Sequence, residues 1–473
     1  TALAQPSPLT LTAPIKRWDE AIPLGNGITG GLLWGEGNLI RLSLDRGDLW
    51  DERLPDMLSH PDWTYSKMRA LKEQGDHKTN VEMFDVPYDT VPYPTKLPAG
   101  RLEIALDPAL ASKSFKLDLE SAEATVDLGA ARVTAFYNRT SPFAMMRITG
   151  TRFAMDAVRL IRPAGLDRLG YDPAVWGGEE VELGRGKTGV LRWMTQRGAM
   201  GLEYTVAFAL ADDSVGQTLA ITITSTPAGI YDGPDALSQA RGRVVMALRE
   251  GYDKSRDDNA KWWGGFWGTS SVSIPDQGLQ QQYDLCKYFY GAASAPDAPP
   301  IPLQGVWTCD NGDLPPWKGD YHNDLNTQMT YLAYPEAGLF EQGESFLNLN
   351  ERLLGQYRKF ARSFYDVPGA VVPGVMTLGG KATGGWGQYS LSPTNGAWVA
   401  QSFYLHWRYT ADAKFLRSRA YPFCEAVGEA LLALAKPDES GRLKLPLSSS
   451  PEIYDNSPRA WLPVVLPERK PAK

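Results

Sequence analysis

The residues best suited to chemistry gather in the polar, aromatic-rich stretch from Leu303 to Leu339. Glycines and the Pro315-Pro316 pair predict a well-formed loop over its first part. A sugar offers apolar C–H faces and a rim of hydroxyl groups, so flat aromatic rings beside carboxylates and amides favour a carbohydrate site. A polar loop that caps a domain is the alternative interpretation. The side chains concerned are Trp307, Asp310, Asp313, Trp317, Asp320, Tyr321, His322 and Asp324.

The amino-acid composition indicates which classes of molecule the protein binds. The net charge of −7 and the lack of any basic block argue against nucleic acid, because its binding relies on Lys and Arg to neutralise phosphates. No apolar run approaches the ~20 residues that a membrane-spanning helix needs. The 15 Trp and 21 Tyr residues fit carbohydrate handling and also fit large cores. We expect an oligosaccharide or polysaccharide substrate, no nucleic acid and no membrane. The sequence leaves the oligomeric state open.

Cysteine and histidine usage gives no sign of a cofactor. The three cysteines, Cys286, Cys309 and Cys424, are widely spaced and include no Cys-x-x-Cys pair, so neither a zinc site nor a disulfide framework is predicted. The four histidines show no metal-ligand spacing. We expect no metal and no cofactor, and calcium binding by loop carboxylates is left open.

The predicted secondary structure that must position these residues changes from strands to helices along the chain. A length of 473 residues favours two or three domains. Residues 1–245 show short alternating runs, such as Arg101–Leu106 and Leu219–Thr224, which predict a large antiparallel β-sandwich. Thr64–Asp76 is the exception, because its apolar spacing is helical.

Residues 246–278 predict a helical linker that ends in an aromatic group, Trp262, Trp263, Phe266 and Trp267, which we expect to pack at a domain junction and not to bind sugar. From residue 279 to 473 we expect a catalytic barrel of helices, incomplete at its C-terminus, whose helices are joined by long polar loops. Leu279, Tyr283, Cys286 and Tyr290 form one predicted apolar stripe. Alternating buried and amphipathic helices joined by long polar loops are typical of an α/α toroid with a pocket at one end.

The first residues, Thr-Ala-Leu-Ala-Gln-Pro, resemble the small-residue end of a secretory signal peptide. This pattern favours a periplasmic or secreted protein.

Five motifs in order carry a resemblance to a known family. They are Leu303-Gln-Gly-Val-Trp, Pro315-Pro-Trp, Asn326-Thr-Gln-Met, Asn395-Gly-Ala-Trp and Ser448-Ser-Ser-Pro-Glu. Together with Pro23-Leu-Gly-Asn-Gly, they resemble glycoside hydrolase family 95, the inverting α-L-fucosidase family. The resemblance implies a multidomain β and α protein, with an N-terminal β-sandwich, a helical linker and an (α/α)6 barrel that holds the active site.

The resemblance also implies catalytic roles. Inverting hydrolysis needs an acid that protonates the leaving oxygen and a base that activates water on the opposite face. The glutamate of Ser-Pro-Glu is the family's general acid, which corresponds to Glu452. Asp324 and Asn326 occupy the positions of the family's two asparagines, and Asp324 can accept a proton where asparagine cannot. Trp317 and Trp386 lie in Gly- or Pro-rich loops and are expected to line the pocket. Tyr321, His322 and Asn395 are further predicted substrate contacts.

The sequence thus predicts an exo-acting inverting glycosidase that removes terminal α-L-fucose or the related α-L-galactose. The chain ends soon after Glu452, so we expect a barrel incomplete at its C-terminus and lacking the family's downstream aspartate base. Two alternatives stay open. Without the aspartate base, the chain could be a non-catalytic carbohydrate-binding protein, and the same architecture is also compatible with a glycoside phosphorylase.

Overall fold

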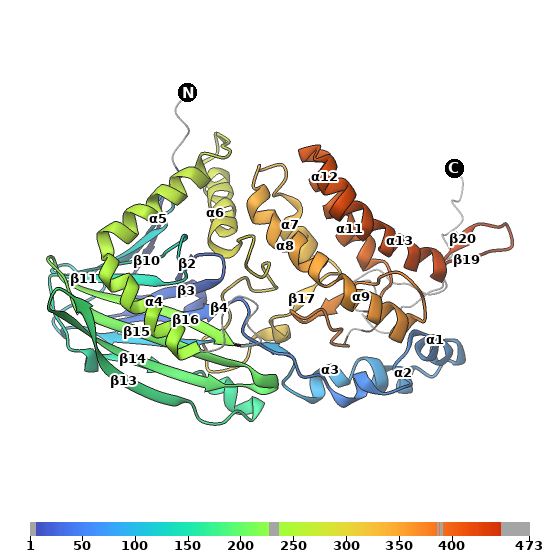
Figure 1. Cartoon of the computed structure of the whole chain (residues 1–473), viewed down its shortest axis with the longest axis horizontal. Helices are drawn as coiled ribbons and strands as arrows, with labels where there is room; N and C mark the ends of the chain where they lie inside the picture. The colour runs from blue at the N-terminus through green and yellow to red at the C-terminus, as the bar shows by residue number, and fades with distance from the viewer. Residues whose placement is uncertain (1–5, 227–235, 386, 388–390, 446–473) are drawn as a thin grey trace. The chain divides into compact units, whose positions relative to one another are not determined.

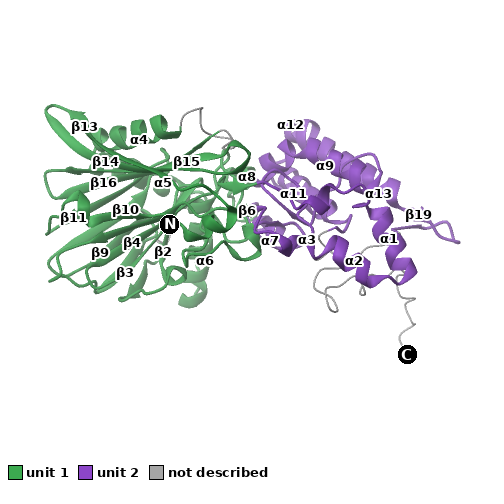
Figure 2. Ribbon diagram, turned by 90° about the horizontal axis from the view of Figure 1, so that it is seen from below, with its two compact units in different colours: residues 1–51, 95–319, 336–345 green, residues 52–94, 320–335, 346–473 purple. Residues whose placement is uncertain are grey.

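The computed structural model describes residues 6–226, 236–385, 387 and 391–445 (Figure 1). The chain divides into two compact units, coloured separately in Figure 2. The sandwich unit contains residues 1–51, 95–319 and 336–345, and the helical unit contains residues 52–94, 320–335 and 346–473. No helix in the described ranges is both long and apolar enough to cross a membrane.

The sandwich unit is built from two antiparallel sheets. In spatial order, the larger sheet within the described residues consists of β1 (Leu9–Thr12), β8 (Ser114–Asp118), β9 (Glu123–Asp127), β10 (Arg132–Tyr137), β11 (Ala144–Thr149), β16 (Gln217–Thr226), β15 (Glu203–Asp212), β14 (Lys187–Arg197) and β13 (Val175–Gly184). The second sheet consists of β12 (Val158–Ile161), β7 (Gly100–Ala105), β4 (Leu39–Arg46), β3 (Thr29–Glu36) and β2 (Ile22–Gly25). A short pair joins β5 (Trp50–Asp51) to β6 (Thr95–Lys96). The predicted N-terminal antiparallel sandwich is confirmed.

The alternating runs become strands because only one side chain in two faces the core. Strand β8 alternates in this way along its length, whereas every residue of β16 is buried. The difference comes from helix α4 (Ala236–Glu250), which lies against β15 and β16 (Figure 1). Its Ala240, Val244 and Ala247 pack in a cluster with alanines of both strands. Both faces of β16 are therefore covered.

Two more helices complete the sandwich unit, α5 (Tyr252–Trp267) and α6 (Gln277–Ala293). The predicted apolar stripe on α6 is wrong, since Leu279 is 61% exposed and Cys286 is exposed as well. The buried face instead carries Lys287 and Tyr288. The Lys287 ammonium donates to the Ser270 carbonyl at 2.5 Å, and the Tyr288 hydroxyl donates to the Pro23 carbonyl at 2.8 Å. Hydrogen bonding makes these polar groups acceptable in the core.

The helical unit begins with the excursion that the sequence predicted at Thr64–Asp76. Helix α1 (Tyr65–Gln74) confirms it, because the Thr64 hydroxyl caps the Lys67 N–H and Gly75 closes the helix in the left-handed conformation. The remaining elements are α2 (His77–Phe84), α3 (Pro87–Thr90), β17 (Tyr321–His322), α7 (Asn326–Leu332), α8 (Phe340–Arg352, which starts in the sandwich unit), α9 (Leu354–Phe360), β18 (Val375–Met376), α11 (Asn395–Thr410), α12 (Ala413–Phe415), α13 (Tyr421–Leu434), β19 (Lys436–Pro437) and β20 (Leu443–Lys444).

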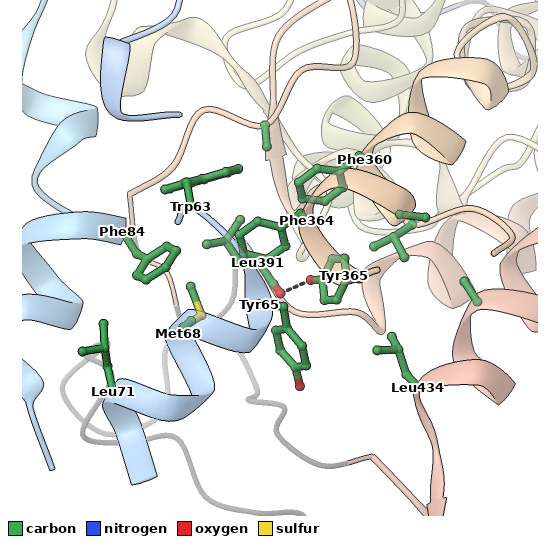
Figure 3. Close-up of a cluster of buried hydrophobic side chains, with 14 residues drawn as sticks. Trp63, Tyr65, Met68, Leu71, Phe84, Phe360, Phe364, Tyr365, Leu391 and Leu434 are labelled. Carbon is green, nitrogen blue, oxygen red and sulfur yellow. Dashed lines mark hydrogen bonds between the residues drawn. The ribbon is translucent and has the colours of Figure 1, made fainter. Parts of the chain in front are cut away.

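An aromatic cluster holds residues 52–94 within the helical unit (Figure 3). Phe364, in the π-helical turn Ala361–Tyr365, lies 4.6 Å from the Trp63 ring and 6.3 Å from the Phe84 ring, centroid to centroid. Tyr365 donates a hydrogen bond to the Leu391 carbonyl. Burial of these rings explains why an excursion between two sandwich strands packs with helices that lie almost three hundred residues later in the chain.

Candidate functional site

The carboxylate-rich loop is divided between the two units, and its first part is tied to strand β4. Thr308 donates to Asp45 through its N–H at 2.9 Å and its hydroxyl at 2.7 Å. Asp310 accepts hydrogen bonds from Ser43 and Arg101, each at 2.7 Å. Burial raises the pKa of Asp45 to about 6. Hydrogen bonds to these two carboxylates therefore fix the first part of the loop to strands β4 and β7 of the sandwich unit.

Trp317 lies on an exposed turn at the end of this first part. Trp317 and Lys318 both adopt positive φ angles, 48° and 57°, and the Trp317 side chain is 56% exposed. Its ring is therefore open, as a pocket-lining aromatic requires, and its contact with substrate stays a prediction.

The second part of the loop forms a buried polar cluster in the helical unit. Strand β17 pairs with β18, and the next residue, Asn323, donates its N–H to the Gly374 carbonyl at 2.5 Å. The Asn323 amide donates to the Pro373 carbonyl at 3.2 Å, and the Gln328 amide donates back to the Asn323 carbonyl. These bonds fix the backbone around Tyr321 and His322, both of which are buried.

An aspartate orients the histidine of this cluster. The Asp320 carboxylate is fully buried and lies 2.5 Å from Nδ1 of His322. The Tyr88 hydroxyl donates to the other Asp320 oxygen at 3.2 Å. A carboxylate bonded to one ring nitrogen fixes the orientation and tautomer of an imidazole. Tyr88 comes from the excursion, so sequence reasoning had no means of placing it here.

Asp324 and Asn326 differ in environment. Asp324 is 5% exposed and belongs to the buried cluster, whereas Asn326 is exposed as the first residue of α7. Two further residues that the sequence did not single out contribute buried acceptors. The side-chain oxygens of Asn323 and Gln328 are buried and have no hydrogen-bond partner among the described residues. Buried oxygens without partners are costly, which marks this cluster as a place where a water molecule or ligand would be held.

Asn395 begins helix α11 and is also buried, and its amide donates to the Ser392 carbonyl at 3.1 Å. Helix α11 contacts α7, and the Tyr334 hydroxyl meets Nδ1 of His406 on α11 at 3.0 Å. Glu452 and Trp386 lie outside the described residues. Within the described ranges, no group of three or more His, Cys, Asp or Glu side chains is arranged to hold a metal ion.

Two protein-family models match separate parts of the chain. Residues 267–460 match the Glycosyl hydrolase family 95 catalytic domain. This part of the chain is therefore similar to family 95 catalytic domains. Residues 9–146 match the Glycosyl hydrolase family 65, N-terminal domain.

Two curated relatives are named as fucosidases. "Alpha-L-fucosidase 2" of Arabidopsis thaliana is 30% identical over 175 residues, which is 36% of this chain and 20% of that protein. "Probable alpha-fucosidase A" of Aspergillus niger is 29% identical over 250 residues, 47% of this chain and 31% of that protein. The chain thus matches less than a third of the length of these relatives.

A solved structure supports the architecture. The structure titled "Putative kojibiose phosphorylase from human microbiome" is similar with a TM-score of 0.60 and 14% identity, over 93% of this chain and 62% of that one. At this identity the likeness concerns the fold alone. It agrees with a sandwich followed by a helical region.

Proposed function

We propose that this protein is an exo-acting, inverting glycoside hydrolase that removes terminal α-L-fucose or α-L-galactose from glycans. The observation that carries the proposal is the buried Asp320–His322–Asp324 cluster, which lies inside the segment matching the family 95 catalytic domain. The fucosidase names of the two curated relatives support the choice of sugar.

In this proposal His322 and Asp324 bind the sugar and the attacking water. Asp320, which accepts a hydrogen bond from the Tyr88 hydroxyl, orients the imidazole of His322, and His322 bonds a sugar hydroxyl. Asp324 accepts a proton from the water, and Asn326 orients that water from the start of α7. Glu452 donates a proton to the leaving oxygen. Inversion requires the acid and base carboxyls to lie about 6.5–9.5 Å apart, which leaves room for the water.

The first experiment follows the product by proton NMR. The chain is incubated with an aryl α-L-fucoside and an aryl α-L-galactoside, and the anomeric signal of the first-formed sugar is recorded. We expect the β anomer from an α-glycoside. Release of the α anomer would show retention and refute the mechanism. Faster product formation in the presence of inorganic phosphate, with sugar phosphate as product, would show a phosphorylase.

Two variants test the roles of the carboxylates. Glu452→Gln should abolish hydrolysis of natural glycans and reduce hydrolysis of fucosyl fluoride much less, because fluoride leaves without protonation. Equal loss on both substrates would exclude Glu452 as the acid. Asp324→Asn should abolish both activities, and a rise in fucosidase activity would instead assign Asp324 to specificity. Calorimetry with a fucosylated trisaccharide distinguishes an inactive enzyme from a carbohydrate-binding protein.

A further inference from the structure

A groove of about 700 Å³ lies in the sandwich unit, beside the C-terminal half of helix α5. The residues that give it chemical character are Asp258, Lys261, Trp262, Phe266, Glu341 and Gln342, all of which belong to that unit. The first four come from α5, and the last two come from the first turn of α8. None of them belongs to the buried cluster of the helical unit. The groove is large enough for a ligand of several sugar rings.

Several polar groups of the groove have no protein partner among the described residues, whereas Asp258 pairs with Lys254 at 2.5 Å. Gln342 is 3% exposed, yet its side-chain amide has no hydrogen-bond partner among the described residues. The indole N–H of Trp262 likewise has no acceptor in that part of the chain, and it is not enclosed. Glu341 and Lys261 form no ion pair within the same ranges. The amide atoms of Gln342 are not among the enclosed polar atoms that lack a partner, so they reach the groove and can bond a ligand there.

The aromatic side of the groove is rigid. Trp262 stacks on Phe266 with ring centroids 5.4 Å apart and an interplanar angle of 11°, and the Arg139 guanidinium lies 4.0 Å from the Trp262 ring centroid. The sequence predicted that this aromatic group packs, which holds for the fully buried Trp263. Trp262 is different, because it is half-buried and presents its edge to the groove.

The charges of the groove point to a neutral ligand. Asp258 and Glu341 line the groove together with Lys261, and Asp258 also pairs with Lys254, so no single sign dominates and an anion such as phosphate would meet two carboxylates. The amide, the carboxylates, the ammonium and the indole N–H offer both donors and acceptors beside aromatic edges. Neutral hydroxyl groups, which donate and accept, match this combination.

We propose that this groove is a second carbohydrate-binding site, built from the sandwich unit alone, which holds a neutral segment of a glycan. The choice of a carbohydrate over another polar ligand rests on the proposed function. Gln342 bonds the hydroxyl groups, Trp262 donates through its indole N–H, and Phe266 forms the apolar floor.

Two neighbouring glycines of α5 provide a matched test. Gly265 lines the groove, whereas Gly264 does not, and neither has an atom within 4 Å of the position that a Cβ would occupy. Leucine at either position suits a helix better than glycine does. Gly265→Leu fills the groove, and Gly264→Leu makes the same change beside it. Gln342→Leu removes the amide and breaks no hydrogen bond to the described protein.

The measurement is isothermal calorimetry with two unfucosylated tetrasaccharides, lacto-N-tetraose and maltotetraose. We expect at least one to bind, with affinity lowered about tenfold or more by Gly265→Leu and by Gln342→Leu. Gly264→Leu should bind as the unaltered chain does. All three variants should keep or raise the melting temperature. Absence of binding by both sugars, equal loss in the two glycine variants, or equally tight binding of a polar tetrapeptide would overturn the proposal. Hydrolysis of aryl α-L-fucosides is measured separately, so failure of the proposed activity would not be mistaken for failure of this site.

Discussion

Replacement of Asp320 probes the link between the excursion and the candidate site. Asp320 is fully buried, touches Nδ1 of His322 at 2.5 Å and accepts a hydrogen bond from Tyr88 at 3.2 Å. Asp320→Ala leaves both partners without this carboxylate. Removal of one member of a buried pair costs about 3–5 kcal/mol in unfolding free energy. Asp320→Asn keeps an oxygen that can accept from the imidazole, so we expect a cost of about 1–3 kcal/mol.

Tyr88→Phe removes only the longer hydrogen bond and should cost about 1 kcal/mol. The double variant with Asp320→Asn should cost less than the sum of the two single changes, because both remove the same contact. Asp89→Asn is the matched control, since Asp89 is exposed and adjacent to Tyr88 in sequence. It should change stability by less than about 0.5 kcal/mol.

The assay is urea unfolding followed by circular dichroism, with substrate binding measured on the same samples. If Asp320 orients His322, Asp320→Asn should weaken binding of fucosylated trisaccharide more than its stability cost predicts, while Tyr88→Phe has a smaller effect on both. The reasoning would be refuted if Asp320→Ala cost no more than the Asp89 control. Additivity of the two single changes would refute the shared contact.

Two further predictions concern the helical unit. Phe364→Ala should cost about 3–5 kcal/mol in unfolding free energy and make residues 52–94 sensitive to limited proteolysis, because Trp63 and Phe84 lose their common ring partner; unchanged proteolysis would contradict this role of the cluster. Burial raises the pKa of Asp85, which accepts the Gly387 N–H, to about 6. Folding therefore favours the protonated carboxyl of Asp85. Its contribution to the free energy of unfolding is fully present below about pH 4 and is lost as the pH rises through about 6. Between these pH values the free energy of unfolding of the unaltered chain should fall by up to about 3 kcal/mol relative to that of Asp85→Asn. Urea unfolding at a series of pH values measures this difference. The same pH dependence in both proteins would contradict the prediction.

The sequence alone was enough to predict features that depend only on neighbouring residues in the chain. The alternating runs at Arg101–Leu106 and Leu219–Thr224 became β7 and β16, since alternation is a property of each strand by itself. Helix α1 was also predictable, because Thr64 and Gly75 supply its two caps within the segment. The ordered motifs likewise indicated a resemblance to family 95, and residues 267–460 match the catalytic domain of that family.

Which face of a helix is buried depended on the elements that pack against it, and the sequence alone did not show this. Helix α6 has an apolar stripe through Leu279, but the structure buries Lys287 and Tyr288 instead, because the carbonyls of Ser270 and Pro23 lie opposite them. Helical spacing shows that residues share a face, and only the neighbouring elements determine which face is buried.

The candidate site shows the same division. The sequence placed the carboxylates of one loop together, yet Asp310 is bound by Ser43 and Arg101 in the sandwich unit, while Asp320 is bound by Tyr88 in the helical unit. Residue types and motifs therefore indicated a carbohydrate enzyme. Which carboxylate became an anchor and which entered the buried cluster depended on contacts across more than two hundred residues, and no local pattern encodes such contacts.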